Sequence, residues 1–309
     1  MLVGWDGAER AVVYGMLKKG ALPNLQKIIN EGSIADIAIT TGKTETKPGW
    51  TEILTGYNAL ALGIFSNEKY EPIPVGYTIF ERVEERYGQE NIVTIFITGK
   101  INNTGARGPH RVCANCYKRD PVTFEKTGWW DETSDTLING VGEKRIFEER
   151  KGEPFYHTKN ALDMYRSALG KAPNVGALAI ELIQTYKDRR FFMFIHFEEP
   201  DEAGHVYGGW SKEYKQGIID DDKYLGEIVS ELKRQNLYGD TVIYIVTDHG
   251  FNQNGRDHYK QPEIFLATND TKKMRSSGTR LDIAPTILDR LGFDIQTIVP
   301  SLNGESIYK

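Results

Sequence analysis

The stretch Phe191–His205, FFMFIHFEEPDEAGH, joins an apolar run to a cluster of acidic residues and a histidine. The run Phe191–Phe197 is typical of a β-strand that is buried on both faces, as in a parallel sheet. Asp201 and His205 are four positions apart, so a helical turn would place both on one face. Polar residues directly after a buried strand are where α/β proteins bind ligands. His196, inside the run, is expected to be a core residue and not a ligand.

The same organisation recurs along the chain. Five further apolar runs predict strands, and amphipathic stretches between the runs predict helices. Strands that alternate with helices favour an α/β fold, with a mostly parallel central sheet sandwiched by helices. The other predicted strands are Leu2–Trp5, Ile34–Thr40, Ile92–Thr98, Thr241–Thr247 and Ile264–Ala267, and the predicted helices are Leu22–Glu31, Thr78–Tyr87, Thr158–Ala168, Gly176–Lys187, Ser211–Gln235 and Leu281–Leu291.

One segment, at about residues 102–154, breaks this alternation. It is rich in Gly, Asn and charged residues, and its hydrophobic periodicity is weak. We interpret residues 1–309 as a single domain, because about 300 residues suit one large α/β domain. The irregular segment is then a small insertion, either a cap over the active site or a surface excursion.

The insertion contains the only two cysteines, Cys113 and Cys116, close to His110. A structural zinc ion needs a fourth ligand, which the sequence does not supply nearby. A local disulfide or a pair of free thiols is therefore the preferred interpretation of this CxxC motif. Trp129 and Trp130 are expected either to pack against the domain or to line a pocket.

Composition excludes several classes of protein. Charged residues are 26% and hydrophobic residues 39% of the chain, which excludes a wholly disordered protein. The net charge of −5 speaks against binding of duplex nucleic acid, since phosphate neutralisation needs a basic surface. No apolar run approaches the roughly 18–20 residues of a membrane span. The start of the chain has no signal-peptide pattern, but removal of a leader would leave the same start, so no localisation is predicted. No oligomeric state is predicted either.

Acidic residues and histidines follow three of the predicted strands. Because the carboxyl ends of parallel strands meet at one edge of a sheet, we expect these side chains to converge. Carboxylate oxygen and imidazole nitrogen together suit Zn, Mn or Fe. The candidate metal ligands are Asp6, Asp201, His205, Asp248, His249 and His258.

The stretch GKTETKPGWTEILTG, residues 42–56, contains a candidate nucleophile. Thr46 precedes Lys47 and Pro48, and Pro is favoured in the first turn of a helix. A helix N-terminus favours anions, and a nearby base or metal activates a threonine hydroxyl for attack. The alternative role of Thr46 is a plain N-cap. Rival hydroxyls in the same stretch are those of Thr44, Thr51 and Thr55.

At these residues the chain resembles the alkaline phosphatase superfamily. Within it, the chain is most similar to the type I phosphodiesterase/nucleotide pyrophosphatase branch, with sulfatases and phosphoglycerate mutases as relatives. The resemblance implies an alkaline-phosphatase-like fold, with residues 1–309 as a single catalytic domain of that type. The matching motifs are WDG at 5–7, TKPGWTEILTG at 46–56, EPDEAGH at 199–205, TDHG at 247–250 and LDIAPTIL at 281–288.

The resemblance also implies a site with two divalent metal ions, usually zinc in this branch, with Mn or Fe as alternatives. Asn67 would donate to a phosphoryl oxygen, and Lys100, in a TGK segment similar to the sulfatase GKWH, would approach the bound anion. Asp201, His205 and His258 would hold one ion, and Asp6, Asp248 and His249 the other, with Thr46 between them as nucleophile and ligand.

The implied activity is that of a two-metal phosphoester hydrolase, which acts on a small-molecule substrate through a covalent phospho-threonine. A phosphodiesterase is the first candidate. Ordinary sulfatases mature a Cys or Ser to formylglycine, whereas this chain has Thr46. His258 follows His249 much more closely than in nucleotide pyrophosphatases, so a nucleotide substrate is not predicted. The alternatives are a phosphomonoesterase, a phosphonate or sulfate ester hydrolase, a phosphosugar mutase, and a non-catalytic metal-binding protein.

Overall fold

The structure, a computed structural model, describes residues 1–113, 116–119, 126–131, 136–138 and 144–309. A large sheet of eight strands forms its centre. These strands are β1 (Leu2–Trp5), β2 (Ser33–Ala38), β3 (Val93–Thr98), β9 (Met164–Arg166), β10 (Phe191–Phe197), β11 (Tyr244–Val246), β12 (Glu263–Thr268) and β13 (Ser277–Thr279).

The sheet is mostly parallel, which confirms the predicted fold class. Its strand order is β13-β2-β12-β11-β1-β10-β3-β9. Strand β12 alone runs antiparallel to both of its neighbours, β11 and β2. No helix separates β11 from β12, and a parallel connection between adjacent strands normally uses one.

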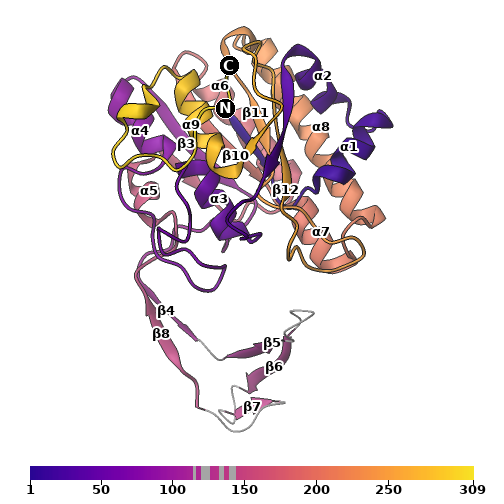
Figure 1. Ribbon diagram of the computed structural model, residues 1–309, viewed down its shortest axis with the longest axis vertical. Coiled ribbons are helices and arrows are strands. Elements are labelled where there is room, and N and C mark those ends of the chain that lie inside the picture. The colour runs from indigo at the N-terminus through magenta and orange to yellow at the C-terminus, as the bar shows by residue number, and fades with distance from the viewer. Residues whose placement is uncertain (114–115, 120–125, 132–135, 139–143) are drawn as a thin grey trace.

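Helices cover both faces of the sheet (Figure 1). Apolar residues of α3, α4 and α9 pack on one face, and those of α1, α2, α6 and α8 on the other.

Within the described ranges, none of the helices combines the length and the apolar character needed to cross a membrane. The α-helices are α1 (Arg10–Lys18), α2 (Pro23–Glu31), α3 (Thr46–Thr55), α4 (Ile79–Tyr87), α5 (Tyr156–Ala161), α6 (Ala172–Thr185), α7 (Glu199–Tyr207), α8 (Lys212–Arg234) and α9 (Ile283–Arg290), and the 3-10 helices are η1 (Tyr238–Asp240), η2 (Arg280–Asp282) and η3 (Ile295–Thr297).

The two helical layers explain why the central strands are mostly apolar on both of their faces. Successive side chains of a strand point to opposite faces of the sheet. Phe194 of β10 therefore belongs to one core and Ile195 to the other, and both are fully buried. A continuous apolar run is the pattern expected for such a strand.

One predicted helix, Thr158–Ala168, is wrong. Helix α5 ends at Ala161, and β9 begins at Met164 and pairs in parallel with β3. The carboxylate of Asp163 accepts a hydrogen bond of 2.8 Å from the backbone N–H of Thr94, which anchors the strand at the sheet edge. Local periodicity did not reveal this, because the partner strand lies about 70 residues earlier.

The described residues between 110 and 150 include five further strands, which extend away from the sheet and its helices in Figure 1. An antiparallel pair is formed by β4 (His110–Cys113) and β8 (Phe147–Arg150). A three-stranded antiparallel sheet is formed by β5 (Tyr117–Arg119), β6 (Lys126–Asp131) and β7 (Thr136–Ile138). The description of 1–309 as one domain with an insertion at 102–154 stays a prediction.

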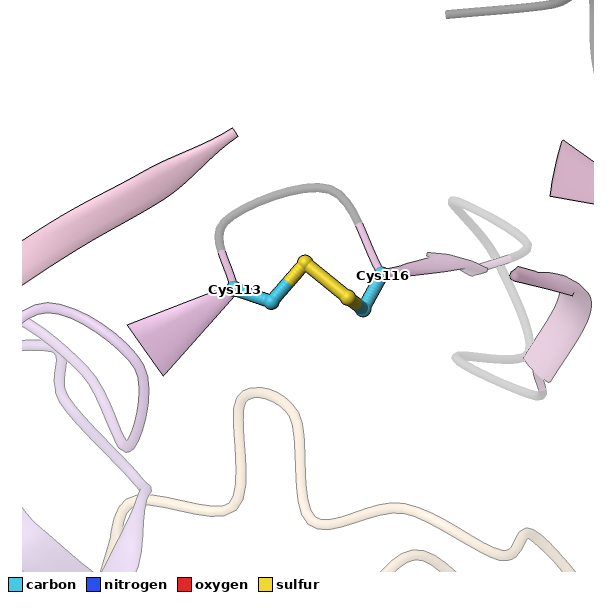
Figure 2. The surroundings of a disulfide bond; sticks show 2 residues. All are labelled: Cys113 and Cys116. Atoms are coloured by element: carbon cyan, nitrogen blue, oxygen red, sulfur yellow. A yellow bond between two sulfur atoms is a disulfide. The ribbon is translucent and has the colours of Figure 1, made fainter. Parts of the chain in front are cut away.

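Cys113 and Cys116 form a disulfide (Figure 2), which confirms that alternative over a zinc site. His110 does not join them, because its ring nitrogen Nε2 lies 3.4 Å from the hydroxyl of Tyr70. The expectation for Trp129 and Trp130 lies outside the side chains that the structure describes.

Candidate active site

Four adjacent parallel strands, β11, β1, β10 and β3, end at the same edge of the sheet. Polar residues follow each of these four strands directly. Asp248 and His249 follow β11, Asp6 follows β1, α7 follows β10, and Lys100 follows β3. The topology therefore brings together side chains that lie far apart in the sequence, as the sequence analysis predicted.

The first group of candidate ligands is Asp201, His205 and His258, whose ligand atoms lie within 4.8 Å of one another. Helix α7 places Asp201 and His205 on one face, with Nε2 of His205 3.4 Å from Oδ1 of Asp201. The other ring nitrogen, Nδ1 of His205, lies 2.8 Å from the carbonyl oxygen of Arg256. In the neutral ring, with Nδ1 as the donor there, Nε2 presents its lone pair to the shared space.

The second group is Asp6, Asp201 and His249, all of them buried. Nε2 of His249 lies 3.5 Å from Oδ1 of Asp6, 3.8 Å from Oδ1 of Asp201 and 3.4 Å from Oδ2 of Asp248. Nδ1 of His249 lies 2.9 Å from the carbonyl oxygen of Gly250, which again leaves Nε2 as a ligand atom. Asp201 therefore belongs to both groups, which the sequence analysis did not predict.

The chemistry of these groups fits divalent metal ions. Oδ1 of Asp201 and Oδ2 of Asp248 are buried and accept no hydrogen bond from any residue that the structure describes. Such oxygens are costly unless a cation or a donor balances them. Burial and the neighbouring carboxylate of Asp6 raise the pKa of Asp248 well above its usual range. Burial lowers the pKa of His258 well below its usual range, which favours the neutral, metal-binding form.

Thr46 lies beside this cluster. It is the first residue of α3 and is 1% exposed, and its Oγ1 lies 3.5 Å from Nε2 of His249. Glu45, and not Thr46, occupies the N-cap position of α3, so the alternative that Thr46 is a plain N-cap is wrong. Gly49 lets α3 approach closely, because a Cβ there would come within 2.8 Å of the Cβ of Asp248.

Two of the rival hydroxyls are engaged within α3. Oγ1 of Thr51 donates to the carbonyl oxygen of Lys47 at 2.7 Å, and Oγ1 of Thr55 donates to the carbonyl oxygen of Thr51 at 2.6 Å. These bonds run along the helix and not toward the carboxylates. Among the three threonines of α3, Thr46 is therefore the best placed candidate for the nucleophile.

Asn67 lies next to the start of α3. Its Oδ1 accepts a hydrogen bond of 2.9 Å from the backbone N–H of Lys47, and its carbonyl oxygen accepts one of 2.9 Å from Nζ of Lys47. With Oδ1 engaged, the amide nitrogen is the group that can donate to a ligand near Thr46. Burial lowers the pKa of Lys47 to about 8, and its ammonium also lies 4.2 Å from the centre of the Tyr70 ring.

Lys100 reaches into the cluster, and in this structure its partners are the carboxylates themselves. Its Nζ lies 3.1 Å from Oδ1 of Asp6 and forms an ion pair with Oδ2 of Asp201. Burial alone would raise the pKa of Asp201, but the Lys100 ammonium holds that pKa well below its usual range. Burial also lowers the pKa of His205, yet the carboxylate of Asp201 outweighs it and raises that pKa to about 9.

Three residues that support the carboxylates were missed or underestimated from the sequence. Nε2 of His196 lies 2.8 Å from Oδ2 of Asp6, and the indole nitrogen of Trp50 donates to the same oxygen at 3.4 Å. Arg280 donates from one guanidinium nitrogen to the carbonyl oxygen of Asp248 at 2.8 Å. His196 is a core residue as predicted, but it also orients Asp6, because β10 lies beside β1 with His196 opposite Gly4.

Replacing His258 by alanine should lower the affinity of the first ligand group for a divalent ion by at least about tenfold, because one of its three ligands is lost. Metal content after dialysis against a limiting metal buffer measures this effect. His157 on α5 lies outside the cluster, so His157→Ala is the control. Equal metal content in the two variants would remove His258 from the ligand set.

Comparison with known proteins supports the same interpretation. Residues 1–293 match the family described as type I phosphodiesterase / nucleotide pyrophosphatase. The human (Homo sapiens) bis(5′-adenosyl)-triphosphatase ENPP4 is 22% identical over 309 residues, which cover 100% of this chain and 56% of the relative. The chain thus spans about half the length of this curated relative.

Two solved structures share the fold. One is a protein in complex with its substrate D-glucosamine-2-N,6-O-disulfate, with 13% identity and a TM-score of 0.60 over 100% of this chain and 79% of the other. The second is the phosphonate monoester hydrolase of Agrobacterium radiobacter, with 14% identity and a TM-score of 0.56 over 99% of this chain and 75% of the other. At these identities the likeness concerns the fold alone. The family match, however, covers nearly the whole chain, and the chain therefore belongs to the type I phosphodiesterase / nucleotide pyrophosphatase family.

Proposed function

We propose that this chain is a metal-dependent phosphoester hydrolase that acts through a covalent phospho-threonine at Thr46. A phosphodiesterase is the first candidate within this class. One observation carries the proposal. The buried hydroxyl of Thr46 lies 3.5 Å from Nε2 of His249, which itself lies within 3.8 Å of carboxylate oxygens of Asp6, Asp201 and Asp248. The family match supports a phosphoester as the substrate class.

The cofactors we propose are two divalent ions, with zinc as the first candidate and Mn or Fe as alternatives. Bound at this edge of the sheet, they would supply Lewis acidity that favours the deprotonated hydroxyl and balances the charge of the phosphoryl group. Asp201, His205 and His258 would hold one ion. Asp6, Asp248 and His249 would hold the other, beside Thr46.

The residues of the chain then have distinct roles. Oγ1 of Thr46 gives up its proton to solvent and attacks phosphorus. A bond from this oxygen to phosphorus forms, the bond to the leaving group breaks, and the leaving alkoxide takes a proton from water to become the alcohol. Since Thr46 is the first residue of α3, the phosphoryl oxygens would lie near the positive end of the helix dipole. Water then cleaves the phospho-threonine and restores the hydroxyl. His196 and Trp50 hold the carboxylate of Asp6 in place during both steps.

Asn67 is proposed to donate from its amide nitrogen to a non-bridging phosphoryl oxygen. Replacing Asn67 by alanine should lower kcat by roughly a hundredfold, as expected when one donor to a developing oxyanion is removed. Asn58, which follows α3 and takes no part in the cluster, provides the matched Asn→Ala control. A fall in metal content together with kcat would contradict the assignment, because a donor to the substrate does not hold the ion.

The substrate class is tested by assaying metal-loaded protein side by side on three reagents. They are bis-p-nitrophenyl phosphate, p-nitrophenyl phosphate and p-nitrophenyl sulfate. Since the human relative is named a bis(5′-adenosyl)-triphosphatase, bis(5′-adenosyl) triphosphate is a fourth substrate to include. A dominant diester rate is the expected result.

The same panel separates the alternatives. A dominant monoester or sulfate rate would replace the phosphodiesterase assignment by a phosphomonoesterase or sulfate ester hydrolase. Transfer of phosphate to a sugar acceptor instead of water would indicate a mutase. Metal binding without turnover of any substrate would favour a non-catalytic metal-binding protein.

A further inference from the structure

The backbone around Lys100 is held firmly at the end of β3. The N–H of Gly99 donates to the carbonyl oxygen of His196 at 3.0 Å. The carbonyl oxygen of Lys100 accepts from the N–H of Ala168 at 3.2 Å and from Oγ1 of Thr104 at 3.5 Å. The side chain is 5% exposed, so the sheet edge directs its ammonium inward.

The ammonium lies between two of the candidate metal ligands. Nζ contacts Oδ1 of Asp6 at 3.1 Å and pairs with Oδ2 of Asp201. Asp6 belongs to the second ligand group, and Asp201 belongs to both groups. Lys100 thus contributes a positive charge where the cluster would otherwise bind cations.

The charges of the cluster make this position significant. Three buried carboxylates, those of Asp6, Asp201 and Asp248, face one another around His249. Together, Lys100 and a single divalent ion carry three positive charges, which balance the three negative charges of these carboxylates. Two divalent ions together with Lys100 would carry five positive charges, an excess that disfavours full loading before Thr46 ionises or an anionic substrate binds.

We propose that Lys100 is a built-in cation that competes with the second divalent ion for the carboxylates of Asp6 and Asp201. The first ion binds without displacing it. Loading of the second ion requires the ammonium to leave at least one of these carboxylates. The inference rests on the proposed function only in taking the cluster as a metal site, and it differs from the expectation that Lys100 simply approaches the bound anion.

The test compares metal-free protein, prepared with a chelator, with its Lys100→Met variant. Methionine keeps an unbranched side chain of similar length but removes the charge. Each protein is titrated with Zn²⁺ and, in a separate experiment, with Mn²⁺. The heat released, measured by isothermal titration calorimetry, gives the affinity for each equivalent of metal ion. The variant should bind the second equivalent at least about tenfold more tightly, and the melting temperature of its metal-free form should fall by roughly 10 °C, because the buried carboxylates lose their counter-ion.

Two control variants isolate the effect. Lys100→Arg keeps the positive charge and should retain the weak second equivalent. Lys223→Met removes an exposed charge on α8 whose ion-pair partner is Glu227, at 3.7 Å, and should leave both quantities unchanged. A Lys100→Met protein that folds only with metal also supports the proposal, since the ion then replaces the ammonium.

Several outcomes would overturn the inference. They are an unchanged second affinity in Lys100→Met, a second equivalent that is weakened, and a variant that stays unfolded with and without metal while Lys100→Arg folds. The readout is independent of turnover. Tighter metal binding by Lys100→Met, together with a metal-loaded parent protein that hydrolyses no substrate, would refute only the proposed function. Hydrolysis by the parent protein, together with unaltered metal affinity in Lys100→Met, would refute only the role of Lys100. Absence of metal binding in all variants would refute both.

Discussion

Replacing Thr46 by alanine is expected to lower turnover of the best phosphoester substrate by on the order of a thousandfold or more, while both metal equivalents remain bound. The hydroxyl is the proposed nucleophile, and no other hydroxyl of α3 faces the cluster in the same way. Thr51 and Thr55 donate to backbone carbonyl oxygens of their own helix. The measurement is steady-state hydrolysis on metal-loaded protein, with metal content determined on the same sample.

Thr46→Ser is the informative control for this prediction. Serine keeps the nucleophilic oxygen at the start of α3, so its activity should lie much closer to that of the parent than to Thr46→Ala. A phosphorylated peptide containing residue 46, trapped by rapid acid quenching, should be detected in the parent and absent in the alanine variant. Substantial turnover by Thr46→Ala would show that another group or a water molecule attacks phosphorus.

Replacing Asp201 by asparagine should have the largest effect on metal binding. Asp201 is 2% exposed and belongs to both ligand groups, so the loss of its charge weakens both. It also removes an ion-pair partner of Lys100. We expect loss of more than one metal equivalent and a fall in turnover of at least about a thousandfold, whereas His258→Ala should affect one equivalent only.

The near-isosteric change separates charge from shape, since asparagine keeps the size and the trigonal geometry of the side chain. Asp220→Asn on α8 makes the same substitution at a residue outside the cluster and should leave metal content unchanged. The comparison of metal stoichiometry in the Asp201, Asp220 and His258 variants tests whether the two ligand groups share a residue. Loss of a single equivalent in Asp201→Asn would show that they do not.

The fold class and the candidate ligands could be predicted from the amino-acid sequence alone. Continuous apolar runs such as Phe191–Phe197 are recognisable because they are buried on both faces, and the helices between them have their own local period. The residues directly after those strands could be predicted to converge, since parallel strands end at one edge. This argument selected Asp6, Asp201, Asp248 and the three histidines as candidate ligands.

Which of these side chains contact one another could not be predicted before the fold was known. The register of β1 against β10 puts His196 within 2.8 Å of Asp6, and the end of β3 brings Lys100 between Asp6 and Asp201. Neither contact has a local signature, because each joins residues about 95 to 190 positions apart. Strand β9 was missed for the same reason, because it is stabilised by its pairing with the distant strand β3.

The sharing of Asp201 by both ligand groups has the same origin. A sequence motif assigns each ligand to one ion, whereas the actual distances depend on how the loops after four strands pack together. Local sequence therefore specifies the strands, the helices and the types of ligand, since these depend on nearby residues. The pairing of charges within the cluster depends on long-range packing, and that was decided only when the chain folded.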